Sequence, residues 1–162
     1  NVDVTPDGKL ALTADNGNSG AADGHVDTVS VIDLEANPPR VIDKVVVGDA
    51  PEGLAISPTG KLAVAVLLKG SNSAPSAPFY NRNASVVALK IDGKKVTRGN
   101  EVDVRGLPEG AVFSQDGRYL YVGNFIDQDI TILRVDGDML VNTGKSLQLP
   151  GHPAAMRGKV TH

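Results

Sequence analysis

A five-residue phrase recurs three times along this chain. It reads TPDGK at residues 5–9, SPTGK at 57–61 and SQDGR at 114–118. Each copy follows a short apolar run and precedes another one. Three occurrences of a phrase built around a glycine and a basic residue, within 162 residues, indicate internal duplication. The repeat therefore constrains the fold before any single residue is assigned a role.

The repeats differ in length at one place. From the anchor glycine of the phrase to the next alternating run, the third copy spans 13 residues (Gly117 to Ile130). The equivalent stretches of the first and second copies span 21 and 26 residues (Gly8 to Val29 and Gly60 to Val86). We conclude that these two copies carry insertions in the same loop.

Within each copy the hydrophobic pattern is that of β-strands. The run KLALTA places Leu10 and Leu12 on one face, and DITILRV alternates β-branched with polar residues. Each phrase supplies a glycine for the positive φ of a tight hairpin, and Asp92-Gly93 marks a second hairpin. No window of ten residues keeps a helical period free of Gly or Pro. Each copy is therefore predicted to form four short antiparallel strands.

Four strands per repeat at this period predict an all-β fold, a β-propeller built of four-stranded blades. We place three blades at about residues 1–49, 50–105 and 106–149, and the start of a fourth at about 150–162. A β-sandwich is the alternative, but it would not repeat its turn residues in register. The whole chain is interpreted as one partial propeller domain.

Three stretches resemble the YVTN-type β-propeller repeat: PEGLAISPTGKLAVAV, PEGAVFSQDGRYLYVGN and DTVSVID. The closest match to the name-giving phrase is Tyr121-Val122-Gly123-Asn124, with Gly in place of Thr. The resemblance covers essentially the whole chain. Relatives include lactonase-like enzymes, surface-layer proteins and the propeller subunits of amine dehydrogenases, so the resemblance implies a scaffold that hosts several tasks.

Rings of this kind usually have ~4–8 blades, and three blades cannot close one. We therefore expect the chain to be part of a six- or seven-bladed protein, or two copies to pair into a six-bladed ring by two-fold symmetry. Open blades would expose apolar flanks. Self-association through the open blade edges is expected for that reason.

Candidate catalytic residues come from the loops that surround the channel of a propeller. Glu52 and Glu109 occupy equivalent points of successive copies, and His152 begins the next one. Two carboxylates and an imidazole at a channel mouth could bind a divalent cation, Ca²⁺ or Mg²⁺, or act as acid and base. The alternative is that Pro-Glu-Gly forms a turn whose glutamate is solvated or accepts backbone N–H bonds.

The two insertions supply further candidates. The first, within residues 16–27, offers Asp23 and Asp27 together with the preceding Asp15 as metal ligands, although the spacing does not match an EF-hand and a flexible polar loop is favoured. The second, within residues 69–84, brings together Phe79, Tyr80, Asn81 and Arg82, a combination typical of recognition surfaces. Alternatively, its aromatic residues pin the loop to the blade beneath. Asn124 is one more ligand-binding candidate.

Several classes of function are disfavoured by composition. The chain has no cysteine, which removes disulfides, thiolate metal sites and cysteine nucleophiles. Its 19 acidic and 16 basic residues form no basic stripe, so we expect no nucleic-acid partner. The longest apolar run, Leu62 to Leu68, is far below the ~20 residues of a membrane span. The sequence also lacks a Gly-x-Ser-x-Gly motif and a phosphate-binding loop.

The sequence favours a binding propeller whose channel-side loops recognise a small molecule or a protein. The lactonase-like branch of the resembling family commonly carries an Arg-His pair where this chain has Pro-Glu-Gly twice and His-Pro-Ala once. A lactonase-like or dehydrogenase-like enzyme is the alternative function. We expect a periplasmic or extracellular location; the lack of a signal peptide is uninformative in a chain that opens without Met.

Overall fold

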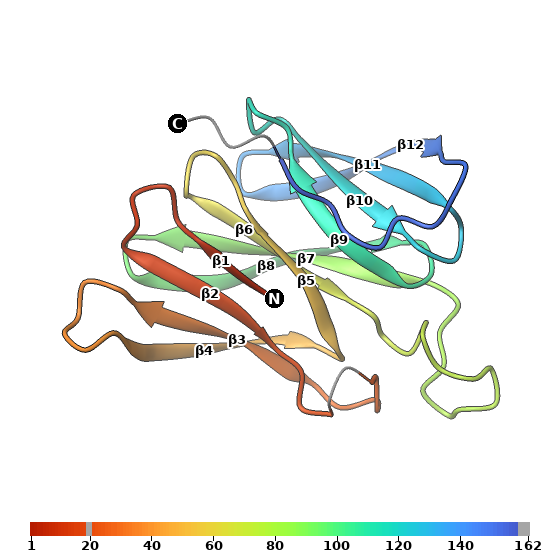
Figure 1. The fold of residues 1–162 in the computed structure, drawn as a ribbon, viewed down its shortest axis with the longest axis horizontal. Coiled ribbons are helices and arrows are strands. Elements are labelled where there is room, and N and C mark those ends of the chain that lie inside the picture. The colour runs from red at the N-terminus through yellow and green to blue at the C-terminus, as the bar shows by residue number, and fades with distance from the viewer. Residues whose placement is uncertain (19–20, 159–162) are drawn as a thin grey trace.

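A computed structural model describes residues 1–18 and 21–158, which form three four-stranded antiparallel sheets (Figure 1). Sheet 1 contains β1 (Val2–Val4), β2 (Leu10–Asp15), β3 (Asp27–Asp33) and β4 (Arg40–Gly48). Sheet 2 contains β5 (Pro51–Ile56), β6 (Leu62–Leu67), β7 (Ala84–Asp92) and β8 (Lys95–Val104). Sheet 3 contains β9 (Pro108–Phe113), β10 (Tyr119–Asn124), β11 (Asp129–Asp136) and β12 (Met139–Gln148).

The all-β prediction with four strands per repeat is confirmed. Within each sheet the strands lie side by side in chain order, so every connection is a hairpin. The three sheets stack next to one another with their first strands adjacent (Figure 1). The described residues contain no helix, and hence none with the length and apolarity needed to cross a membrane.

The recurring phrase forms the same turn in all three sheets. In the first copy the N–H of Gly8 donates to the carbonyl oxygen of Thr5 at 2.8 Å, and the N–H of Leu10 donates to the Thr5 hydroxyl at 3.1 Å. The glycine adopts a left-handed φ of 71°, which other residues adopt at a cost. The equivalent bonds and glycine conformations recur at Ser57 with Gly60 and at Ser114 with Gly117.

Sheet 2 lies between the other two sheets and is covered on both faces. This explains why β6 is a continuous apolar run: all six of its residues are buried. One face of sheet 2 packs against sheet 1 and the other against sheet 3, giving two hydrophobic clusters. The first cluster includes Leu12, Val29, Leu67 and Leu89, and the second includes Val64, Val86, Leu120 and Leu133.

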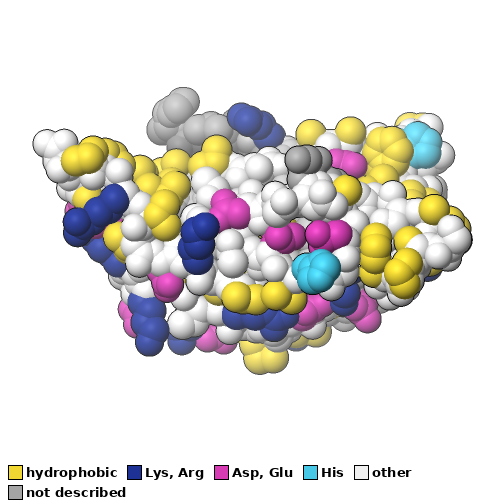
Figure 2. Space-filling model, turned by 90° about the horizontal axis from the view of Figure 1, so that it is seen from below, with side chains coloured by type: hydrophobic (Ala, Val, Ile, Leu, Met, Phe, Trp, Pro, Cys, Tyr) yellow, Lys and Arg dark blue, Asp and Glu magenta, His cyan; other side chains and the backbone are white. Residues whose placement is uncertain are grey.

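The outer face of sheet 1 combines apolar and polar side chains. The strand register places Val2, Val4, Val41 and Val46 on this face, and their exposed fractions are 63, 45, 53 and 53%. Between them lies a polar centre in which Asp15 accepts hydrogen bonds from Thr13, Thr28 and Ser30. Figure 2 views the molecule from this side and shows acidic and uncharged polar surface near its middle. The flank is thus less apolar than the sequence predicts.

Residues 150–158, where we expect the first strand of a fourth blade, form no strand in the structure. The segment crosses the front of sheet 3 beside β9 (Figure 1). A Cβ built on Gly110 would lie 2.8 Å from the backbone nitrogen of Met156, and one built on Gly123 would lie 3.0 Å from Pro153. The segment therefore packs closely on glycines of sheet 3 without strand pairing. The rest of the segment expected to begin a fourth blade, residues 159–162, lies outside the described part of the chain.

The connections divide between two ends of the sheets. At one end, called the turn end below, lie the turns from first to second and from third to fourth strand, including the three copies of the phrase. At the other end, called the loop end, lie the connections between second and third strands and the links from one sheet to the next. Nearly all predicted site residues belong to the loop end.

Candidate functional site

Two long loops at the loop end border an open cavity of about 620 Å³. The β2–β3 connection covers residues 16–26 and the β6–β7 connection covers 68–83, whereas the β10–β11 connection has only residues 125–128. The cavity lies beside the ends of the outer strands of sheets 1 and 2. Its wall is mainly apolar, with a few charged groups; the lining includes Gly24, Val26, Val46, Asp49, Lys69, Phe79, Asn81, Arg98 and Glu101. The insertions predicted from repeat lengths thus contribute residues to the wall of this cavity.

Phe79 links the two long loops and also faces the cavity. Its partly buried ring packs against the small cluster of Ala22, Ala50 and Leu68. A Cβ built on Gly24 would lie 3.0 Å from Phe79 Cβ, so the loops touch at this point. Asn81 lines the same cavity, and its amide donates to the carbonyl oxygen of Lys69 at 2.8 Å. Both sequence alternatives for Phe79, anchoring and recognition, are compatible with this position.

A charged group lies at the outer side of the cavity. Glu101 accepts hydrogen bonds from Lys69 Nζ at 2.9 Å, from Ser85 Oγ at 2.6 Å and from Arg98 Nη2 at 2.6 Å. Burial by itself would raise the pKa of Glu101, but the bonds from Lys69, Ser85 and Arg98 outweigh it and hold the pKa below its ordinary value. Glu101 therefore stays ionised and holds two cations beside the cavity.

Arg82 lies outside the cavity and joins two loops. Its guanidinium makes a bidentate pair with Asp127, at 2.6 and 3.1 Å, across the junction between sheets 2 and 3. The hydrogen bond from Arg82, against the cost of burial, lowers the pKa of Asp127, which also accepts the N–H of Gly106 at 2.9 Å. Tyr80 is half-buried and is not part of the cavity wall. The structure thus separates Arg82 and Tyr80 from Phe79 and Asn81.

Glu52 and Glu109 lie on neighbouring first strands, as the repeat register predicts. A Cβ built on Gly53 would be 3.2 Å from the carbonyl oxygen of Glu109, which shows how closely β5 and β9 approach. Both glutamates are half-buried. Burial first, and then the charge of Glu52, raise the pKa of Glu109 above its ordinary value. Glu109 is therefore protonated more readily than an ordinary glutamate.

His152 is engaged elsewhere. Its ring stacks on Phe125, with centroids 4.6 Å apart, and Nδ1 lies 2.6 Å from the Phe125 carbonyl oxygen. Nε2 lies 3.2 Å from the side-chain nitrogen of Gln128. Within the described ranges no hydrogen bond or ion pair joins His152 to Glu52 or Glu109. The predicted convergence of all three groups is therefore not seen; only the two glutamates interact.

Asn124 is fully buried between sheets 3 and 2 rather than facing a ligand. Its amide nitrogen donates to Asp129 and to Thr131, at 2.8 Å each, and so ties the end of β10 to β11. Asp129 also pairs with Arg105 at 3.0 Å. The motif residue that suggested ligand binding instead holds two strands together through its amide nitrogen, while its buried side-chain oxygen accepts no hydrogen bond within the described residues.

The three aspartates named as metal candidates do not converge. Asp15 accepts hydroxyl bonds on the outer face of sheet 1, and Asp23 lies beside His25, 3.3 Å from its Nδ1. Asp27 accepts the N–H groups of Gly17 and Ala50, at 2.9 and 3.1 Å. Across residues 1–18 and 21–158, no group of three or more His, Asp or Glu side chains is arranged to bind a metal ion.

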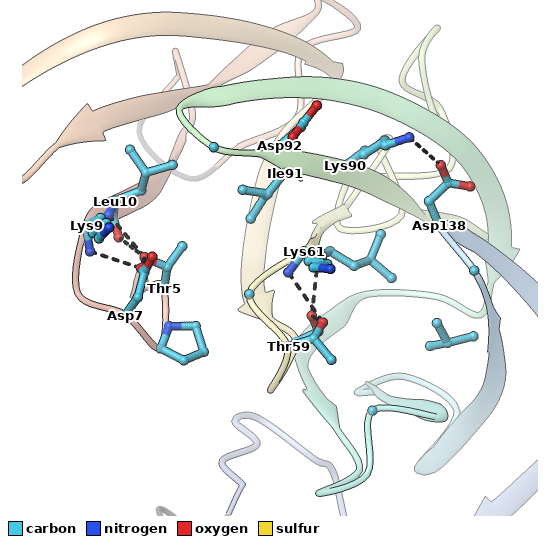
Figure 3. Close-up of a pocket in the computed structure, with 18 of the residues that line it drawn as sticks. Thr5, Asp7, Lys9, Leu10, Thr59, Lys61, Lys90, Ile91, Asp92 and Asp138 are labelled. Atoms are coloured by element: carbon cyan, nitrogen blue, oxygen red, sulfur yellow. Dashed lines mark hydrogen bonds and ion pairs between the residues drawn. The ribbon is translucent and has the colours of Figure 1, made fainter.

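A larger cavity, of about 1270 Å³, lies at the turn end among the three copies of the phrase (Figure 3). Most of its charged groups pair with one another: Lys90 with Asp138 at 3.2 Å, Arg118 with Asp116 at 2.6 Å, and Lys9 with Glu35 at 3.9 Å. The polar groups of its turns are likewise bonded within each turn (Figure 3). Most of the polar groups in this cavity are therefore already paired within the protein.

Sequence reasoning missed the charged residues of the smaller cavity: Asp49, Lys69, Arg98 and Glu101. Lys69 begins the second insertion, and its place there was the one available signal. Arg98 and Glu101 occupy an outer strand whose polar residues look alike in the sequence. Only the packing of sheet 1 beside sheet 2 sets Arg98 and Glu101 apart from the other polar residues of this strand.

Comparison with solved structures identifies the fold. The chain superimposes on a putative 6-phosphogluconolactonase from Bacteroides fragilis with a TM-score of 0.75 at 20% identity, over 96% of this chain and 40% of that one. A putative 6-phosphogluconolactonase from Bacteroides uniformis gives 0.69 at 20% identity, over 94% and 42%. The hydrazine synthase of Kuenenia stuttgartiensis gives 0.69 at 20% identity, over 95% and 51%.

The fold is that of a lactonase-like β-propeller. At about one fifth identity these likenesses establish fold and not activity. The chain spans about two fifths to one half of the length of these three proteins. No family model matches the sequence, and no curated protein matches it.

Proposed function

We propose that this protein is a ligand-binding β-propeller that takes a small molecule in the cavity at the loop end. The observation that carries the proposal is that both insertions, the places where the repeats differ most in length, contribute residues to the wall of that cavity. Loops held by a regular scaffold are where binding residues concentrate. Phe79 and Asn81 supply the apolar and polar contacts expected of such a wall.

Backbone conformation also favours the loop end as the place where a ligand binds. Four non-glycine residues have φ between 50° and 54°, namely Ala50, Lys69, Leu107 and Gln128, and all lie in loop-end connections. At the turn end, the positive-φ residues in the described turns are glycines. Such strain is kept where the surrounding structure fixes it, often at binding sites. Two of these four residues, Ala50 and Lys69, adjoin the cavity or line it.

The proposal is tested by a thermal-shift screen of small-molecule fragments. A ligand that binds the native state raises Tm, by an amount that grows with the logarithm of its concentration above Kd. We expect hits whose stabilisation disappears in Phe79→Ala and persists in Ile126→Ala, which removes an exposed apolar side chain from the short β10–β11 loop. Hits that stabilise Phe79→Ala as well as the wild type would place binding outside this cavity.

A second candidate is an enzyme that uses Glu52 and Glu109 as acid and base. It is favoured by the raised pKa of Glu109 and by two structural neighbours described as putative 6-phosphogluconolactonases. With glucono-δ-lactone as substrate, Glu109→Gln should lower the hydrolysis rate by about 100-fold or more. Equal hydrolysis rates for the wild type and Glu109→Gln would rule out this enzymatic function.

A divalent cation, Ca²⁺ or Mg²⁺, between Glu52 and Glu109 is the metal-binding form of the same proposal. Two carboxylates alone are a small ligand set for either ion. Stoichiometric metal in the purified protein that is lost in Glu52→Gln and Glu109→Gln would support it. Metal content that is independent of both substitutions would contradict it.

A further inference from the structure

We infer that the ligand of the loop-end cavity has an apolar body and a single carboxylate end. This inference rests on the proposed function, because it specifies what the same cavity binds. It follows from a comparison of the hydrogen-bonding groups that the cavity wall has already satisfied with those that it leaves open.

The apolar part of the ligand follows from the wall. Val26 and Val46 line the cavity and are 69 and 53% exposed, and the ring of Phe79 adjoins them. Large aliphatic groups that gather at the rim of a pocket and stay exposed commonly mark a surface that a partner covers. An apolar ligand body would cover all three side chains.

Every carboxylate oxygen of the wall already accepts at least one hydrogen bond. Asp49 accepts the backbone N–H groups of Asp23 and Gly24, at 3.2 Å each. Both oxygens of Glu101 accept bonds, from Lys69 and Ser85 on one side and Arg98 on the other. Among the side-chain oxygens that line the wall, only Asn81 Oδ1 accepts no hydrogen bond within the described residues.

The basic groups keep free donors. The Lys69 ammonium has three N–H bonds, of which the contact to Glu101 uses one. Arg98 donates from Nη2 to Glu101 and from Nε to the carbonyl oxygen of Val47 at 3.3 Å. Its Nη1 group makes no hydrogen bond within the described residues. Most of the open capacity is thus on donors, which a ligand satisfies with acceptor atoms.

The charge balance of the wall argues against a dianion. The lining cations Lys69 and Arg98 face the lining anions Asp49 and Glu101, so the wall has no excess of positive charge for a phosphate dianion. A carboxylate matches the planar fork of a guanidinium and accepts two hydrogen bonds from it. An apolar carboxylate therefore fits both the wall and its donors.

The test compares octanoate with 1-octanol, which have the same apolar body but differ in the anionic end. We expect octanoate to bind the wild-type protein about tenfold more tightly, since hydrogen bonds to charged groups are stronger than neutral ones. Arg98→Gln and, separately, Lys69→Gln should remove most of this preference. The matched control is Arg134→Gln, which removes an arginine paired with Asp136 on β11, with 47% side-chain exposure against 40% for Arg98.

The outcomes separate this inference from the proposed function. Equal affinity for the two probes, or an octanoate preference that survives both substitutions, would overturn the carboxylate inference and leave cavity binding intact. Failure of octanoate to bind would also overturn it. If no fragment of any class binds in a manner sensitive to Phe79→Ala, the proposed function itself fails.

Discussion

At the scale of single residues, the recurring phrase is explained by a fixed set of local bonds. The hydroxyl residue closes the turn, the glycine provides the left-handed conformation, and the third position of the phrase bonds the hydroxyl. In sheet 3, for example, Ser114 Oγ donates to Asp116 at 2.6 Å while it accepts the N–H of Tyr119 at 3.0 Å. Because the first, third and fourth positions each have a distinct task, their order is kept in all three copies.

Gly8→Ala tests the conformational requirement by itself. Gly8 has a φ of 71°, and a Cβ built on it would meet no atom within 4 Å, so the cost would come from the backbone alone. We expect a loss of about 1–2 kcal/mol in the free energy of unfolding, measured by urea denaturation. Gly151→Ala is the control, because its added Cβ also meets nothing and its φ is not positive. Equal stability of Gly8→Ala and wild type would contradict the argument.

Asp116 tests the electrostatics of the same turn. The bond from Ser114, then those from the backbone and side chain of Arg118, lower the pKa of Asp116 to about 2. Because this pKa is depressed in the folded state, its stabilising effect is present above about pH 4 and is lost as pH falls toward 2. Ser114→Ala should raise the Asp116 pKa toward 3.8, as followed by carboxyl NMR titration. Ser57→Ala, whose turn has Thr59 in place of the aspartate, should leave it unchanged.

At the scale of elements, the loops hold neighbouring sheets together as well as enclosing the cavity. Asp127 receives the guanidinium of Arg82 from the β6–β7 loop and the N–H of Gly106 from the link between sheets 2 and 3. Asp27 plays a similar part between sheets 1 and 2, since it accepts the N–H of Ala50. Side chains of these connections thus fix the junctions through backbone amides.

Arg82→Ala tests the role of this junction. It should lower the free energy of unfolding by about 1 kcal/mol and speed amide exchange at Gly106, whose acceptor Asp127 loses its bidentate partner. Arg82→Lys keeps the charge but not the planar fork and should give an intermediate exchange rate. An unchanged Gly106 exchange rate in Arg82→Ala would show that Asp127 is held without Arg82.

At the scale of the whole molecule, equivalent faces of two sheets have different surroundings: the face is covered in sheet 3 and lies on the outside of the molecule in sheet 1. In sheet 3 the flank with Asn124, Asp129 and Thr131 is buried against sheet 2. In sheet 1 the equivalent polar centre, Asp15 with Thr28 and Ser30, lies on the outer face and is also bonded internally. Polar groups with internal partners can be covered by another sheet at little cost. The outer face of sheet 1 is therefore suited to an association, and self-association remains our prediction.

Static light scattering over a range of protein concentrations tests this prediction. We expect an average mass above the 16.8 kDa of one chain that rises with concentration. Val4→Lys and Val41→Lys, which place charges on the outer face of sheet 1, should lower it toward one chain. Met139→Lys, at an exposed site on β12, should not. A wild-type mass of one chain at all concentrations would refute self-association.

Much of the fold could be predicted from the sequence because its determinants are local. The glycine turns and the alternation in KLALTA specify strands and hairpins without reference to distant residues. The repeat then places equivalent residues at equivalent points, which is why Glu52 and Glu109 were expected near each other and do interact. The start of a fourth blade was also expected over about residues 150–162, and residues 150–158 form no strand, since local pattern does not guarantee a pairing partner.

The candidate site depended on tertiary structure to a greater degree. The sequence alone determined the all-β fold, the length of the two insertions and the aromatic character of the second. The structure decided that Phe79 and Asn81 share a cavity wall, that Arg82 pairs with Asp127 and that Asn124 is buried. The physical reason is that side-chain partners across a sheet junction are set by packing of residues some 20 to 50 positions apart, as for Arg82 with Asp127 (45 positions). No local pattern encodes those partners.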